Sequence, residues 1–198
     1  MHAAEQKRPD VAAARARWRR QQPTLDPAKL IFLDETSTTT NMARLYGRCP
    51  RGERLIRAIP HGHRMTTTFL AGLRLDGVIA PLVLDGAING ENFPAHVEQF
   101  LAPALVPCNL VVMDNLPARK VAGVRGAMEA ADAEPSTLPA YSPDPDPIEN
   151  LFAKLTAMPG KAAERNVDDL WDSIGELAGQ ITEVECRGYF RHAGYVQT

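Results

Sequence analysis

Apolar residues form runs and short alternating stretches that predict five β-strands. The run at 30–33, Leu-Ile-Phe-Leu, is continuous, which is typical of a strand buried on both faces. A β-branched strand is expected over 66–73, with a hairpin partner over 78–84 across the Asp-Gly turn between them. Two further strands are expected over 110–114 and 135–139.

In the rest of the chain, apolar residues recur at three- and four-residue spacing, which predicts helices. The predicted helices span residues 9–22, 92–105, 116–131, 148–158, 167–181 and 183–190. Because Pro159-Gly160 interrupts the pattern, the helix that begins at 148 is expected to end or kink near Met158, and the next to begin after about Asn166. The order of elements predicts a mixed five-stranded α/β sheet with helices on both faces and a meander of the first three strands.

Two stretches between these elements follow neither pattern. Residues 36–62 are rich in Thr, Arg, Gly and Pro, which predicts a long loop or an irregular hairpin. Residues 141–147 contain three alternating prolines, so we expect a stiff extended connector in which Asp144 and Asp146 are turn or cap acids. Since only one helix and a linker precede the first strand, the chain divides into residues 1–28 and a single domain over 29–198.

Composition is that of a soluble globular protein. The 198 residues are 44% hydrophobic and 23% charged, with a net charge of −2. Cys49, Cys108 and Cys186 are odd in number and widely spaced, which argues against a disulfide framework or a zinc cluster and indicates reduced thiols in the cytoplasm. No signal peptide is evident, and no apolar run approaches the roughly 20 residues of a membrane span, so no membrane partner is expected.

Charge is distributed unevenly along the chain. Residues 1–29 carry a net +4, residues 44–64 a net +5 and residues 164–186 a net −6. Basic segments are usually solvated faces, but they also suit a polyanion such as DNA.

Acidic residues follow the buried strands. Asp34 and Glu35 end the first apolar run, Asp114 and Asn115 end the fourth, and Glu149 stands at the start of a predicted helix. Each acid alone could be a solvated loop residue. Together, carboxylates from two strand ends and one helix provide what a two-metal phosphoryl-transfer site needs.

Several short motifs carry a resemblance to a known family. The most specific are Tyr-Ser-Pro-Asp at 141–144 and Pro-Ile-Glu at 147–149, and 34 residues separate Asp114 from Glu149. The other matching stretches are 32–36, 44–48, 50–52, 113–115 with Lys120, and 183–195. On these motifs the chain resembles the catalytic region of bacterial insertion-sequence transposases of the mariner-like group, the DDE superfamily endonucleases.

The resemblance implies a ribonuclease-H-like fold over 29–198, with extra C-terminal helices. It implies that Asp34, Asp114 and Glu149 are the catalytic residues and hold two Mg²⁺ or Mn²⁺ ions, and that the enzyme performs metal-dependent DNA strand cleavage and strand transfer. Glu35 is expected as an auxiliary ligand, or otherwise as an acid that orients its loop. Asn115 is expected as an auxiliary group near the metals, or otherwise as a cap or turn residue.

The expected partners are the DNA of the element ends and the target, with a homodimer in the DNA complex. Basic side chains near the acids are expected to bind DNA phosphates. These are Arg44, Arg48, Arg51, Arg54, Arg119 and Lys120, and the arginines of 15–20 are expected to add to them. Because relatives read DNA with an N-terminal helix-turn-helix part that is not evident here, a separately encoded part could supply it.

The chain departs from the family pattern at three places. It has Arg119 where relatives carry His, Ala140, Pro145 and Asp146 in the proline-rich motif, and Pro159-Gly160 in the helix that begins at 148. All three carboxylates remain. The alternative function is therefore a catalytically inactive transposase remnant that only binds DNA or a full-length partner.

Overall fold

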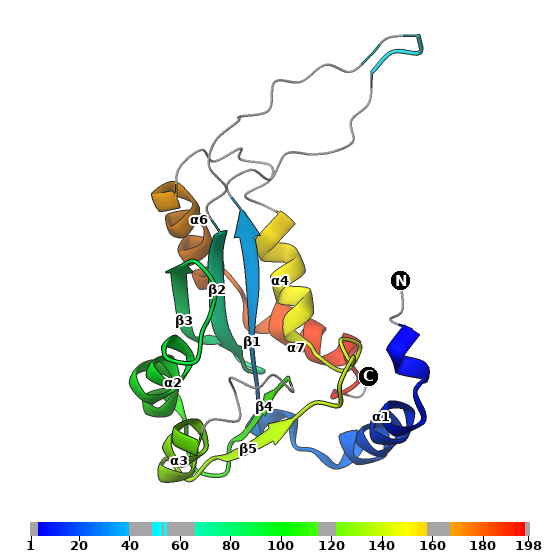
Figure 1. Cartoon of the computed structure of the whole chain (residues 1–198), viewed down its shortest axis with the longest axis vertical. Coiled ribbons are helices and arrows are strands. Elements are labelled where there is room, and N and C mark those ends of the chain that lie inside the picture. Colours follow the sequence, from blue (N-terminus) through cyan, green and yellow to red (C-terminus); the bar gives the residue numbers. More distant parts are fainter. Residues whose placement is uncertain are drawn as a thin grey trace.

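A five-stranded sheet forms the middle layer of the protein, and helices cover both of its faces (Figure 1). The computed structural model describes residues 4–39, 49–52, 54, 66–114, 122–157 and 167–196. The strands are β1 (Leu30–Thr39), β2 (Thr66–Leu73), β3 (Val78–Asp85), β4 (Leu110–Met113) and β5 (Glu134–Thr137). The helices are α1 (Pro9–Gln21), α2 (Asn92–His96), α3 (Ala122–Ala130), α4 (Ile148–Ala157), α6 (Val167–Gly179) and α7 (Glu183–His192).

The strand order in the sheet is β3-β2-β1-β4-β5. The first three strands are antiparallel neighbours, while β4 and β5 run parallel to β1. This arrangement confirms the predicted mixed sheet and its initial meander. It puts β1 at the centre, where the antiparallel and parallel halves meet.

The apolar run of β1 is buried on both faces, as its continuity predicts. Leu30 and Phe32 belong to the core beneath α4, α6 and α7, whereas Ile31 and Leu33 belong to the core beneath α2 and α3. Each of these four side chains is at most 1% exposed. The alternation of faces along a strand therefore distributes one short run between two cores.

The long loop or irregular hairpin predicted from residue 36 begins later than expected, because residues 36–39 still belong to the sheet. β1 continues to Thr39, and its second half pairs with the start of β2, from Thr36 opposite Phe69 to Thr39 opposite Thr66. Threonine is β-branched and suits an extended, paired backbone, so this polar stretch continues the strand. Of the predicted loop, residues 40–48, 53 and 55–62 lie outside the described residues.

The predicted helices are present, but their ends differ from those expected. The helix over 92–105 begins as α2, continues as a π-helical segment at Val97–Leu101 and ends as a 3₁₀ turn at Ala102–Ala104. α4 is described to Ala157 and α6 from Val167, and the predicted break between them lies outside the described residues. No helix in the described ranges is long and apolar enough to cross a membrane.

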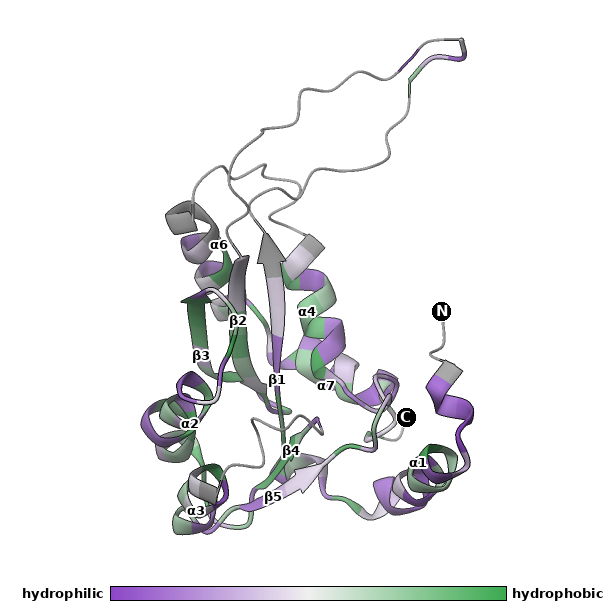
Figure 2. Cartoon of the chain, viewed as in Figure 1, coloured by the Kyte–Doolittle hydropathy of each residue, from purple (hydrophilic) through white to green (hydrophobic). Residues whose placement is uncertain are grey.

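Figure 2 shows that hydrophilic residues are frequent on α1, which packs at one edge of the domain. Its buried side chains are Val11 and Trp18, two members of the apolar stripe that predicts the helix. The indole Nε1 of Trp18 donates a hydrogen bond of 3.0 Å to the Tyr195 hydroxyl, which donates one of 2.7 Å to the Pro145 carbonyl. Burial raises the pKa of Tyr195, so this phenol stays protonated and can donate.

A bulge between β2 and β3 shapes a buried histidine site. Gly72 is required there, because a Cβ at this position would lie 2.8 Å from Ile79 Cγ1. The pairing shifts beyond Leu70, and Ala80 on β3 adopts a φ of 47°. The Ala80 carbonyl accepts a 2.7 Å hydrogen bond from Nε2 of His96, whose Nδ1 is buried without a hydrogen-bond partner among the described residues.

This histidine should make the fold sensitive to acid. Burial lowers the pKa of His96, against a smaller opposing effect of the Ala80 carbonyl, so the folded protein binds a proton there less readily than the unfolded chain. Stability from this group is complete above the unfolded pKa of about 6.5 and is lost as pH falls towards the folded pKa. Between pH 7 and pH 5, the free energy of unfolding should fall by up to about 2 kcal/mol less in His96→Gln than in the wild type, as measured by urea unfolding. The exposed His192→Gln is the control; an equal pH dependence in both variants would contradict the assignment.

Candidate active site

Asp34 of β1 and Asp114, which directly follows β4, occupy neighbouring positions. Leu33 of β1 and Met113 of β4 are the last paired residues of the two parallel strands, and the two aspartates directly follow them. On its other side, Asp34 pairs with Ala71 of β2. Both aspartates are half-buried, so strand pairing holds the backbone of the two acids together at a partly solvated position.

The same alternation places both acids on one face of the sheet. Leu30, Phe32 and Val112 all belong to the core beneath α4 and α7. Side chains two residues apart on a strand share a face, so Asp34 lies on this side with Phe32. Asp114 directly follows β4, and the same alternation, continued by one residue, assigns it to the side of Val112. The two carboxylates therefore belong to the sheet face that α4 covers (Figure 1).

Glu149 lies in the first turn of that covering helix. α4 begins at Ile148, and its apolar residues Ile148, Leu151, Phe152 and Leu155 are buried in the core it shares with β1. Oδ1 of Asp146 accepts a 3.3 Å hydrogen bond from the backbone N–H of Ile148, which caps the start of the helix. Glu149 is exposed, and a carboxylate in a first turn is favoured by the helix dipole.

The three predicted acids thus come from elements that pack together, but they do not form a compact cluster. Within the described ranges, no three His, Cys, Asp or Glu side chains are close enough to hold a metal ion. Asp34 and Asp114 directly follow the last register pair of β1 and β4, Leu33 and Met113. Glu149 lies on the helix over the same face without completing a group of three. As oxygen donors, all three suit a hard divalent cation such as Mg²⁺ or Mn²⁺.

The remaining predicted site residues are only partly described. Glu35 is half-buried on β1, and alternation assigns it to the face opposite Asp34. Arg51 and Arg54 are exposed. The other predicted site residues lie outside the described ranges: Arg44, Arg48, Asn115, Arg119 and Lys120.

The proline-rich segment 141–147 is neither strand nor helix, as predicted, but it is not extended throughout. The backbone of Tyr141 has a φ of 56°, and the N–H of Asp146 bonds the carbonyl of Pro143 at 3.1 Å, which closes a turn. Asp146 caps α4, as predicted. Asp144 instead forms ion pairs with Arg15 and Arg19 of α1.

The sequence did not predict these contacts of Arg15 and Arg19 with Asp144. The side chain of Arg15, predicted to bind phosphate, is only 11% exposed and contacts the protein itself. The sequence held one indication of a shared partner, because Arg15 and Arg19 are four residues apart and lie on the same helix face. Nothing local, however, indicated that this face meets residues 141–144.

Comparisons with known proteins agree with this architecture. The family described as DDE superfamily endonuclease matches residues 29–170. No curated protein matches the sequence.

Solved structures of Mos1 mariner transposase have a similar fold. The Mos1 paired end complex with Mn is 18% identical, with a TM-score of 0.73, over 98% of this chain and 60% of that one. The paired-end complex with the left transposon end is also 18% identical, with a TM-score of 0.64, over 95% and 57% of the two chains. The Mos1 catalytic domain is 15% identical, with a TM-score of 0.60, over 98% and 89%. The chain therefore spans about 60% of the length of the complexed Mos1 chain, and it has the ribonuclease-H-like fold predicted for it.

Proposed function

Since the chain belongs to the DDE superfamily of endonucleases, we propose that it is the catalytic region of a transposase, which cleaves DNA at the ends of an insertion sequence and transfers the strands to target DNA. The observation that carries this proposal is the strand register, which places Asp34 and Asp114 at adjacent positions. Both aspartates belong to the sheet face that α4 covers, and the first turn of α4 contains Glu149. Carboxylates in this arrangement suit phosphoryl transfer.

Asp34, Asp114 and Glu149 are the proposed catalytic residues. The two aspartates would hold divalent cations from the sheet, and the glutamate would hold them from α4. When bound, two Mg²⁺ or Mn²⁺ ions would stabilise the attacking and leaving oxygens of an in-line displacement at phosphorus. The chain itself contributes rigidity, since pairing of Asp34 with β2 and burial of the preceding residues fix the backbone beneath the acids.

The proposed partners are DNA and a second copy of the chain. Two of the similar Mos1 structures are paired-end complexes, one of them with the left transposon end. By analogy we propose that this protein binds element ends as a homodimer in the cytoplasm, with base recognition supplied by a helix-turn-helix part. Glu35 and Asn115 would assist at the acids, and Arg44, Arg48, Arg51, Arg54, Arg119 and Lys120 would bind phosphates.

One observation favours a second candidate function. The three acids do not form a group that could hold a metal ion among the residues the structure describes. In a catalytically inactive remnant, Glu149 would stay apart from the aspartates, and the protein would only bind DNA or a full-length partner.

A nicking assay separates the two functions. The purified chain is incubated, with Mn²⁺ or with a chelator, with a supercoiled plasmid. The plasmid carries the DNA that flanks the reading frame encoding this chain. An active transposase converts the plasmid to nicked circles only when Mn²⁺ is present. A chain that retards the plasmid in a gel but never nicks it is the remnant.

DNA binding by this chain should depend strongly on salt. Arginines bound to phosphates release counterions, and four such contacts would cost about a hundredfold in affinity between 50 mM and 200 mM salt. Fluorescence anisotropy of a labelled duplex measures this slope. Replacing the exposed Arg51 and Arg54 with Ala should lower the slope by about two, whereas Arg187→Ala on α7 should leave it unchanged. Equal slopes for all variants would remove these two arginines from the DNA interface.

A further inference from the structure

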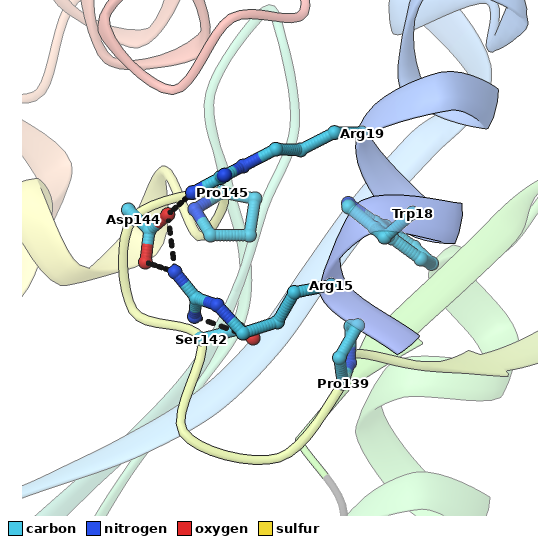
Figure 3. A pocket seen from close by; sticks show the side chains of 7 residues that line it. All are labelled: Arg15, Trp18, Arg19, Pro139, Ser142, Asp144 and Pro145. Carbon is cyan, nitrogen blue, oxygen red and sulfur yellow. Dashed lines mark hydrogen bonds and ion pairs between the residues drawn. The ribbon is translucent and has the colours of Figure 1, made fainter. Parts of the chain in front are cut away.

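Helix α1 is tied to the segment that leads into Glu149. Both guanidinium arms of Arg15 are engaged: Nη2 lies 2.7 and 2.8 Å from the two carboxylate oxygens of Asp144, and Nη1 donates to the Tyr141 carbonyl at 2.6 Å and the Ser142 hydroxyl at 2.9 Å. Arg19 adds a 3.0 Å bond to Asp144. Figure 3 shows the two arginines reaching from one helix to the same carboxylate.

The contacts hold an otherwise unfavourable backbone. Tyr141 has a φ of 56°, which is uncommon for a residue with a side chain, and its carbonyl accepts bonds from both Arg15 and Gln6. Burial favours protonated Asp144, but hydrogen bonds from Arg15 and Arg19 outweigh it and hold the pKa of this carboxyl below its usual range. At neutral pH the acid is therefore charged and can anchor both arginines.

The seam between α1 and this segment is a fixed contact and not a ligand pocket. The hollow lined by Arg15, Trp18 and Asp144 has no room for a water molecule. A second link lies beside it, where Trp18 reaches the Pro145 carbonyl through the Tyr195 hydroxyl. Gln22, near the end of α1, also donates to the Ala193 carbonyl at 2.6 Å.

We propose that Arg15 is a positioning residue for Glu149: by clamping residues 141–144 it fixes the path of the chain into the first turn of α4. The connector has no strand or helix of its own, so its course depends on such contacts. From Asp144 the chain passes directly through the turn closed by Asp146 and the cap on Ile148 to Glu149. The inference rests on the proposed function, since it concerns the third carboxylate of that site.

The test compares Arg15→Ala and Asp144→Ala with Arg8→Ala, a control that removes an exposed ion pair with Asp10 from the N-terminal end of the same helix. Hydrogen exchange of the Asp146, Ile148 and Asn150 amides reports the clamp without metal, and calorimetric titration with Mn²⁺ reports the site. Either substitution should speed exchange of these amides and weaken Mn²⁺ binding by about tenfold. The double variant should lose less than the sum of the two single ones, because both substitutions remove the ion pair between Arg15 and Asp144. Arg8→Ala should change neither property.

Arg15→Lys is the second variant, because it keeps the charge and most of the stem, and it should change both properties in the same direction. A clamp that is merely structural would lower the melting temperature but leave exchange at 146–150 and Mn²⁺ affinity at wild-type values at low temperature, and this result would overturn the inference. If the wild type binds Mn²⁺, Glu149→Gln weakens it and Arg15→Ala does not, the positioning role alone is wrong. If the wild type binds no Mn²⁺, the proposed function fails, and the inference fails with it.

Discussion

Asp114→Asn is expected to reduce metal-dependent nicking of DNA by at least about a thousandfold while the protein remains folded. The substitution keeps the shape of the side chain but removes the charge that would hold a cation beside Asp34, and metal stabilisation of the transition state is worth several kcal/mol, at about 1.4 kcal/mol per tenfold in rate. Glu149→Gln should have an effect of similar size. The measurement is the initial rate of plasmid nicking in Mn²⁺, with circular dichroism to confirm the fold.

Asp132→Asn is the matched control for this experiment. Asp132 is exposed, and its φ of 53° is one that asparagine tolerates well, so the same chemical change should be silent there. Nicking by Asp114→Asn at the control rate would remove this residue from the catalytic set.

Phe32→Ala is expected to destabilise the fold by about 3–5 kcal/mol. Phe32 is fully buried on β1, two residues before Asp34, and its ring contacts Phe190 at a centroid distance of 5.5 Å and Tyr195 at 5.0 Å. Truncation leaves a cavity between the sheet and α7 and removes two aromatic contacts. Urea unfolding at neutral pH measures the loss.

Val184→Ala on α7 serves as the comparison, because Val184 is 79% exposed and its truncation should stay within about 0.5 kcal/mol of wild type. If both substitutions cost the same, Phe32 does not connect the central strand to the C-terminal helix as described.

The core of the fold could be predicted because its signal is local. The apolar run at 30–33 needs only its own continuity to indicate a strand buried on both faces. The extension of β1 to Thr39 could not be predicted in this way, because Thr and Ser also suit loops. What decides it is pairing with Thr66–Phe69, about 30 residues further along the chain.

In the candidate site, too, the features with a local sequence signal could be predicted and those that depend on long-range packing could not. Acids that follow buried strands could be identified from the sequence, since parallel strands bring their carboxyl ends to one edge. The clamp of Arg15 on Asp144 joins residues 129 positions apart, so no local pattern indicates it. Phosphate binding was predicted for Arg15 from its charge. It is wrong because the side chain is largely buried, and only the packing of α1 determines that burial.

The most direct test of the proposed metal site is anomalous diffraction from crystals soaked in MnCl₂. If the two aspartates hold the metal, a strong manganese peak is expected within coordination distance, about 2.0–2.4 Å, of carboxylate oxygens of both Asp34 and Asp114, with Glu149 turned towards it. A peak that contacts other side chains, or no peak at these two aspartates at millimolar Mn²⁺, would contradict the claim that they form the catalytic metal site.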